Sequence, residues 1–258
     1  MLHLDTESDF WQARSSLIVT DPSGADIAMP DEVQVYTVSG VPHAPFRALT
    51  KPVMQLPGNR LGYGAFMRAL LVALFEWVEH GTASPDSRFP SRAAGTLVPL
   101  AEAHEKFPRL SRVNFPRVLN ELRLRDHSVE PPIESTAYPV FVQSTDADGN
   151  ALGGIRHPLI TVPLATHVGW SLRASGYGEG ELFTIQGSMV PFAETEAERR
   201  RTGDPRPSRE MRYGSREAWA VRLADAVHRL VAERLLLAED GDRLMAAAHE
   251  TWDVYHAL

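Results

Sequence analysis

Cysteine is missing altogether from this 258-residue chain. The chain can therefore form no disulfide, no thiolate nucleophile and no cysteine-ligated metal site. Lysine is nearly missing too: Lys51 and Lys106 are the two lysines among 26 basic residues, a bias to which we attach no function. The ten histidines include no H-E-x-x-H motif and no pair at ligand spacing, so the sequence predicts neither a metal site nor a cofactor.

The chain also lacks a basic excess and a long apolar run. A formal charge of −7 argues against a nucleic-acid partner, because phosphate binding needs a positive field. No apolar stretch reaches the roughly 20 residues of a membrane span, since residues 66–78 are interrupted by Arg68 and Glu76. The first ten residues hold three carboxylates where a secretory signal would be basic, so the sequence assigns no cell compartment.

The remaining composition is that of a folded protein, with 43% hydrophobic residues and room for a sizeable core. Alternation predicts strands at residues 1–4 and 33–38. A wide apolar arc over residues 66–78 predicts a largely buried helix that ends at Gly81. The fold class expected from this mixture is α/β.

The rest of the chain, from residue 82 onward, has a different expected secondary structure. Prolines punctuate residues 82–135, which we expect to be loop-rich, and two alternating runs around a Gly-Asn turn predict a β-hairpin at about 138–164. Apolar spacing predicts helices within about 216–255. We therefore divide the chain into a core at 1–81 and an extension at 82–258.

A histidine stands where the second predicted strand ends. The stretch "VQVYTVSGVPH" runs from strand into a turn of small residues and delivers His43, while Glu7 and Asp9 follow the first strand. Many α/β-hydrolases place the acid of a catalytic triad after one strand and the histidine after the next. The chemistry needs a neutral imidazole oriented by a carboxylate. The alternative is a surface histidine beside a solvated acidic loop.

The strings "DTESDFW", "VYTVSGVPHAP", "GIRHPLITVPLATHVGW" and "TGDPRPS" are spread along the chain and resemble a large bacterial α/β-hydrolase-domain family. The resemblance implies that His43 is the triad base and Asp9 its acid, with Glu7 as the fallback acid. It also implies that the chain is the C-terminal portion of the fold. The last two sheet strands and a buried helix would come first, followed by the loop-rich, hairpin and helical extension.

A nucleophile is not found. Such a hydrolase needs a serine on a tight elbow, written G-x-S-x-G, and no such motif occurs in the 258 residues. The nearest string, "GWSLR", lacks the second glycine, and the resembled family has asparagine where this chain has Ser171. We expect the nucleophile in a missing N-terminal half or a partner chain. A sheet without its neighbouring strands would be poorly stable or self-associate.

Other candidate sites carry weaker patterns. "DADGNALGGIRH" resembles a calcium loop at Asp146 and Asp148, but its sixth and twelfth positions do not fit, which favours a simple turn. Phe46, near His43 in sequence, is a candidate substrate contact. The sequence also contains four aromatic residues that are predicted to lie in the core, with pocket lining as the alternative: Trp170, Tyr177, Phe183 and Phe192.

An arginine-rich run begins at Arg199 and continues to Arg216. Such a run could bind a phosphate or a carboxylate. Acidic residues are interspersed through and beside it, and this favours a charged loop that is paired internally.

Two functions are therefore carried forward. The first is hydrolysis of an ester or related acyl bond of a small molecule, with His43 and Asp9 as base and acid and with the nucleophile outside this chain. The second is a non-catalytic relative that acts as a binding or interaction module.

Overall fold

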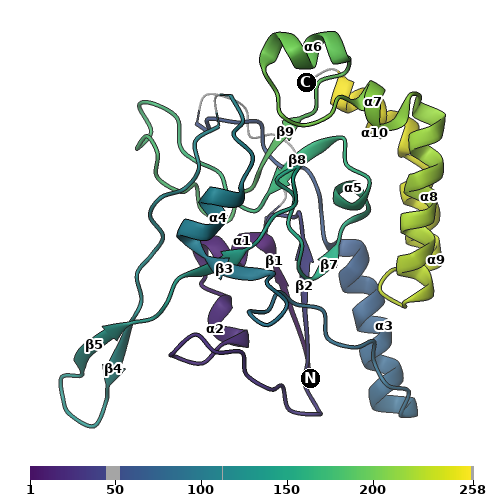
Figure 1. The fold of residues 1–258 in the computed structure, drawn as a ribbon. Coiled ribbons are helices and arrows are strands. Elements are labelled where there is room, and N and C mark those ends of the chain that lie inside the picture. The colour runs from purple at the N-terminus through teal and green to yellow at the C-terminus, as the bar shows by residue number, and fades with distance from the viewer. Residues whose placement is uncertain (45–52, 112, 257–258) are drawn as a thin grey trace.

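A computed structural model describes residues 1–44, 53–111 and 113–256 (Figure 1). Its strands are β1 (Leu2–Thr6), β2 (Gln34–Ser39), β3 (Leu97–Pro99), β4 (Arg123–Asp126), β5 (Ile133–Ala137), β6 (Phe141–Gln143), β7 (Ile155–Arg156), β8 (Ala165–Val168) and β9 (Ser188–Pro191). Its helices are α1 (Glu7–Gln12), α2 (Ser16–Val19), α3 (Gly64–His80), α4 (Leu100–Lys106), α5 (Pro158–Thr161), α6 (Glu196–Thr202), α7 (Arg209–Tyr213), α8 (Arg216–Ala232), α9 (Ala238–Ala246) and α10 (Ala248–His256).

A small parallel sheet lies at the centre, in the order β1-β2-β7. β1 and β2 pair from Leu2 with Gln34 to Thr6 with Val38, and β7 continues the pairing at the end of β2. β2 is buried along almost its whole length, as expected of the middle strand of a parallel sheet. Both predicted strands are confirmed to within two residues, and the mixed α/β class is confirmed with them.

The hairpin predicted at about 138–164 forms only as a short antiparallel bridge, between Thr145 and Ala151 around the turn at Gly149. Its predicted arms do not pair with each other, because β6 before the turn pairs with β3 and β7 after it joins β2. Residues beyond β7 enter α5, where Pro158 begins the helix and His157 Nδ1 accepts a hydrogen bond from Leu159 N. The turn could be predicted because it depends on residues that are neighbours in the sequence. The strands that flank it pair with strands far away in the chain, which the local pattern does not indicate.

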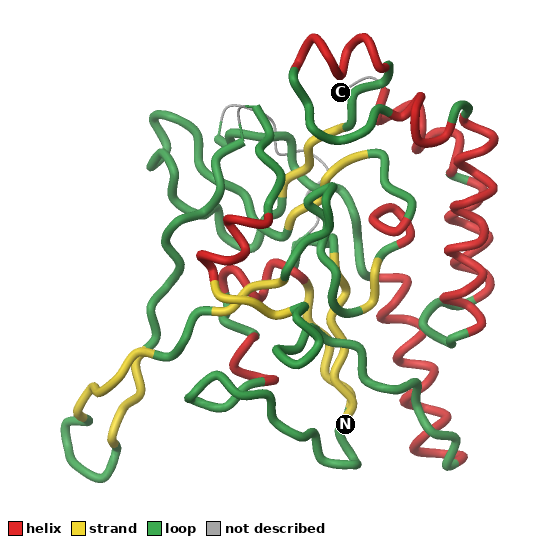
Figure 2. The backbone as a smooth tube through the Cα atoms, viewed as in Figure 1, coloured by secondary structure: helices red, strands yellow, loops and turns green. Residues whose placement is uncertain are grey.

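Two hairpins that the sequence did not predict are β4–β5 and β8–β9. Every residue of β4 and β5 is exposed, and the pair extends from the body as an arm, coloured as strand in Figure 2. The segment around it consists mostly of loops with short elements, in line with the predicted loop-rich character of 82–135.

Helix α3 begins and ends where the sequence predicts, with Gly81 as a left-handed C-cap at φ 68°. The prediction that it is largely buried is wrong. An inner stripe that includes Phe66 and Leu70 is buried, but Phe75 and Val78 are 60% and 71% exposed. The main core cluster packs against one side of the helix, and the other side faces solvent in the described part of the chain.

The main core cluster brings together distant parts of the chain. Tyr36 and Val38 of β2 pack in it with Phe66 of α3 and with Trp219 and Leu223 of α8. Helices α8, α9 and α10 lie within the range that the apolar spacing predicts. The core spans both sides of the proposed boundary at residue 81, which stays a prediction.

Candidate active site

Two neighbouring strands of the parallel sheet end at the same edge and lead into the polar residues of the site. β1 ends at Thr6 and runs directly into α1, and β2 ends at Ser39 and runs into the turn that carries His43. Because β1 and β2 are parallel, their following residues meet on one side of the sheet. The carboxylates of α1 therefore come close to the His43 turn.

Helix α1 is held by its two aromatic residues. Phe10 packs in one buried cluster, and Trp11 packs in another with Trp170, at a ring-centroid distance of 6.0 Å. Both side chains are almost completely buried. The helix is therefore fixed in rotation, and this fixes the direction in which Asp9 points.

The two oxygens of Asp9 have separate partners. Oδ2 accepts hydrogen bonds from Thr6 N at 2.7 Å and from Thr6 Oγ1 at 2.8 Å. Oδ1 lies 2.9 Å from His43 Nδ1. The carboxylate is thus anchored at the start of its own helix and presents its other oxygen to the imidazole.

The His43 side chain is half exposed, at 51%, while that of Asp9 is 9% exposed. Because a carboxylate oxygen can only accept, Nδ1 carries the proton in this contact, and Nε2 of the neutral ring is left as the acceptor. This arrangement suits a base that takes a proton from a hydroxyl at Nε2.

The turn before His43 requires a glycine. Gly40 has φ +81°, and a Cβ at this position would lie 2.5 Å from the Ile160 side chain. Val41 and Pro42 are buried between Gly40 and His43. The backbone is therefore constrained up to the residue that bears the imidazole.

Glu7 occupies a different position from Asp9 despite their closeness in sequence. It is 2% exposed, and its two oxygens accept hydrogen bonds from Gly40 N at 2.8 Å and Gly169 N at 2.9 Å. Burial raises the pKa of Glu7 to about 7, although both backbone N–H groups act in the opposite direction. The structure places Asp9, and not the fallback Glu7, against His43.

Ser171 lies two residues beyond Gly169 and is fully buried. Its Oγ has no hydrogen-bond partner among the described residues, and its carbonyl accepts from Phe183 N at 2.8 Å. Within the described part of the chain, no hydrogen bond joins Ser171 to His43. This burial does not suit a nucleophile that must meet substrate.

Comparison with known proteins adds the family. A family model described as "Alpha/beta hydrolase domain" matches residues 1–246. The chain belongs to the Alpha/beta hydrolase domain family. The match covers nearly the whole chain and includes most of the region predicted to be an extension. No curated protein and no solved structure matches the chain.

Asn59 belongs to the site but was not predicted from the sequence. Asn59 is buried, and its Nδ2 donates to Gly40 O at 2.8 Å. Its Oδ1 accepts from Leu61 N at 3.0 Å and lies 3.2 Å from His167 Nδ1. The surrounding "PGNRLGYG" has the composition of an ordinary turn, so the sequence contains no signal for this role.

Two buried histidines lie behind the site. Burial lowers the pKa of His157 to about 4 and that of His167 to about 3, so both rings are neutral. Tyr255 Oη lies 3.1 Å from His167 Nε2, which links α10 to Asn59 through the ring. These histidines are buried hydrogen-bonding groups, with His167 fully enclosed and His157 4% exposed.

Phe46 lies outside the described residues. Of the aromatic residues predicted to be core, Trp170 and Phe192 are buried, whereas Tyr177 is 44% exposed. Phe183 is partly buried, and its ring lies 4.8 Å from the Arg173 guanidinium carbon.

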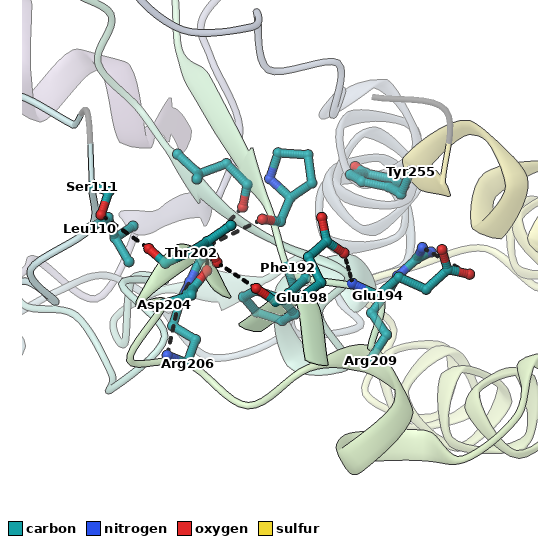
Figure 3. Close-up of a pocket in the computed structure, with 13 residues that line it drawn as sticks. Leu110, Ser111, Phe192, Glu194, Glu198, Thr202, Asp204, Arg206, Arg209 and Tyr255 are labelled. Carbon is teal, nitrogen blue, oxygen red and sulfur yellow. Dashed lines mark hydrogen bonds and ion pairs between the residues drawn. The ribbon is translucent and has the colours of Figure 1, made fainter. Parts of the chain in front are cut away.

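A cavity of about 470 Å³ lies apart from the His43–Asp9 contact, between β9, α6 and α10 (Figure 3). It is lined in part by Arg206, Arg209 and Tyr255. The guanidinium of Arg206 donates hydrogen bonds to Asp204, to Thr166 Oγ1 and to the carbonyls of Val190 and Pro191. Neither His43 nor Asp9 lines this cavity.

The arginine-rich run is paired with acidic residues, but only in part with those in and beside the run, as the sequence favours. Arg199 and Arg200 bind Glu196 beside it, whereas Arg212 binds Asp148, which lies far from it in the sequence. Asp146 accepts from Arg156 Nη2 at 2.7 Å and from backbone N–H groups of its own turn. The carboxylates of the suspected calcium loop are therefore occupied by arginines.

In residues 1–44, 53–111 and 113–256, no cluster of three or more His, Asp or Glu side chains could hold a metal ion. None of the helices described there has both the length and the apolar character needed to cross a bilayer.

Proposed function

We propose that this chain supplies the acid and the base of a serine-hydrolase-type site that cleaves an ester or a related acyl bond. The observation that carries the proposal is the 2.9 Å contact between Asp9 Oδ1 and His43 Nδ1 at the edge of the parallel sheet. Membership of the Alpha/beta hydrolase domain family supports it.

In the proposed reaction His43 Nε2 takes the proton of a serine hydroxyl as that oxygen attacks the acyl carbon. The imidazolium then gives the proton to the leaving alkoxide, and water repeats the cycle to release the acid. Asp9 holds the ring in the tautomer with the proton on Nδ1 and stabilises its positive charge. The Thr6 contacts keep the Asp9 carboxylate in place.

We place the nucleophile and the oxyanion hole outside these 258 residues. The absence of a G-x-S-x-G elbow from the sequence supports this, and so does the complete burial of Ser171. The chain would then correspond to the C-terminal portion of the complete catalytic fold. A further segment of the polypeptide, or a partner chain, would bring the serine to His43.

We propose that the region beyond residue 82 shapes the substrate pocket. Ala44 N donates to Ile185 O at 3.2 Å, directly after His43. Ile185 N donates to Gln12 Oε1, and Gln12 Nε2 donates to Phe183 O at 3.1 Å. Residues 183–185 therefore border both α1 and the His43 turn, where an acyl or alcohol group would lie.

The test is active-site labelling in the native host. The gene is tagged on the chromosome, the lysate is treated with a fluorophosphonate probe, and the tagged protein is purified with everything bound to it. We expect a labelled serine in a peptide outside the 258 residues. His43→Ala should abolish the labelling, because the serine then has no base.

His228→Ala is the matched control, since this residue is an exposed histidine on α8. It should leave the labelling unchanged. A labelled Ser171 would contradict the placement of the nucleophile. Labelling that is absent from the wild-type protein, or that persists in His43→Ala, would overturn the hydrolase and favour a non-catalytic module.

A further inference from the structure

One buried carboxylate joins the ends of three strands. Glu7 is the residue directly after β1, Gly40 directly follows β2, and Gly169 directly follows β8. Glu7 Oε2 accepts from Gly40 N at 2.8 Å, and Glu7 Oε1 accepts from Gly169 N at 2.9 Å. Each oxygen thus ties a different strand exit to the start of α1.

The backbone at Gly40 is held from both sides. Its N–H donates to Glu7, and its carbonyl accepts from Asn59 Nδ2 at 2.8 Å. The same residue has φ +81° and lies against Ile160. Gly40 stands three residues before His43, so the device fixes the point from which the histidine turn leaves the sheet.

Close approach at Gly169 completes the arrangement. A Cβ at Gly169 would lie 2.6 Å from the backbone carbon of Glu7 and from Ser8 N, so only glycine lets this strand exit reach the carboxylate. Glu7 itself does not touch the imidazole, because both of its oxygens are engaged elsewhere.

We propose that Glu7 is a positioning residue of this site: it holds Gly40 and Gly169 together, so that the His43 imidazole stays within hydrogen-bonding distance of Asp9. The proposal rests on the proposed function for its catalytic meaning. The bridging itself can be measured without any enzymatic activity.

The chemistry requires a glutamate. Two N–H donors need two acceptor oxygens, which a carboxylate supplies and a carboxamide does not, because its NH₂ group would face an N–H. An aspartate is one methylene shorter and cannot span both donors from the same backbone position. Glu7→Gln therefore removes one acceptor at constant shape, and Glu7→Asp keeps the charge but shortens the reach.

The first experiment uses the wild-type 258-residue chain, labelled with ¹⁵N and ¹³C, at a pH above the Glu7 pKa of about 7, where Glu7 is a carboxylate. Scalar couplings across hydrogen bonds should connect the Gly40 and Gly169 amide nitrogens to the Glu7 side-chain carboxyl carbon. If neither coupling is seen while backbone couplings in β1 and β2 are, the bridge does not exist. This measurement does not depend on a variant that folds.

The second experiment compares variants by amide hydrogen exchange and by the imidazole nitrogen spectrum of His43. In Glu7→Gln and Glu7→Asp we expect exchange at Gly40 and Gly169 to accelerate roughly tenfold or more, the effect of losing one buried hydrogen bond. The His43 spectrum should shift from one tautomer, protonated on Nδ1, toward a mixture.

Asp240→Asn is the matched control, because Asp240 is also a buried carboxylate, bound by Arg68 and Arg243 on the far side of α3. It should leave Gly40, Gly169 and His43 unchanged. If exchange at Gly40 and Gly169 and the His43 spectrum changed equally in the control, Glu7 would only stabilise the fold in general, and the proposal would be overturned. Labelling that survives His43→Ala would instead overturn the proposed function, with the couplings at Gly40 and Gly169 intact.

Discussion

Asp9 and Glu7 stand two residues apart and have unlike environments. Asp9 is buried beside the half-exposed His43 and divides its two oxygens between Thr6 and His43. Glu7 is buried against the backbone N–H groups of Gly40 and Gly169, and burial raises its pKa to about 7. Carboxylates in different surroundings take different tasks, and here one orients a ring while the other holds the backbone.

Asp9→Asn should nearly abolish the proposed activity. The amide can present its NH₂ group to the imidazole, which favours the tautomer protonated on Nε2 and removes the base. We expect the rate of ester hydrolysis by the complete protein to fall by about three to four orders of magnitude. The measurement is the initial rate with a chromogenic acyl ester, and a loss of less than tenfold would remove Asp9 from the mechanism.

Glu7 should make stability depend on pH above about 5. Its pKa is higher in the folded protein than in the unfolded chain, so its contribution is complete at low pH and is lost as the pH rises through about 7. Between pH 5 and pH 8 this loss is about 2 kcal/mol. Urea unfolding of the wild type and Glu7→Gln at both values should give that difference, and parallel curves would contradict it.

Helix α3 illustrates how an element can match its sequence pattern and still differ in burial. Its apolar residues extend around most of the helix, yet only the stripe toward β1 and the core is covered. Arg68 ties it to α9 through a two-pronged pair with Asp240, with distances of 2.9 and 2.6 Å. A second ion pair, between Glu76 of α3 and Arg234 at 2.6 Å, adds to this attachment.

Substitutions on the two faces of α3 should differ sharply. Leu70→Ala removes a buried side chain and should lower the free energy of unfolding by about 2–4 kcal/mol. Leu71→Ala, one residue later and 57% exposed, should change it by less than about 1 kcal/mol. Chemical denaturation of both variants gives the comparison. Similar losses would mean that the outer face is covered in solution.

At the scale of the whole molecule, the described residues form a small parallel sheet with helices α3 and α8 beside it and an exposed arm, β4–β5, at the opposite side (Figure 1). The core cluster unites β2, α3 and α8, so the early and late parts of the chain are stabilised together. Buried polar groups sit inside this common core, among them His157 and His167.

These two histidines should make the protein labile to acid. Their pKa values are lowered to about 4 and about 3 by burial, so their contribution to stability is complete above about pH 6.5 and is lost as the pH falls. Each should lower stability by roughly 3 kcal/mol at pH 4 relative to neutral pH. Circular dichroism should follow a cooperative unfolding in this range. His167→Asn should lower the midpoint pH, and an unchanged midpoint would exclude His167 as a cause.

The sequence by itself determined the local features. Alternation located β1 and β2, the 3.6-residue period located α3 and Gly81 ended it, since these signals depend on neighbours within a few residues. The order of strand, carboxylate, strand and histidine, together with the family resemblance, singled out Asp9 and His43 before any contact was known.

Only the tertiary structure decided the rest. Which of two nearby carboxylates faces His43 depends on how Trp11 and Phe10 rotate α1 in the core. Glu7 meets Gly169 across a separation of 162 residues, and Asn59 meets His167 across 108. Hydrogen bonds and burial between such distant positions have no periodicity along the chain, so they arise only when the packed elements bring them together.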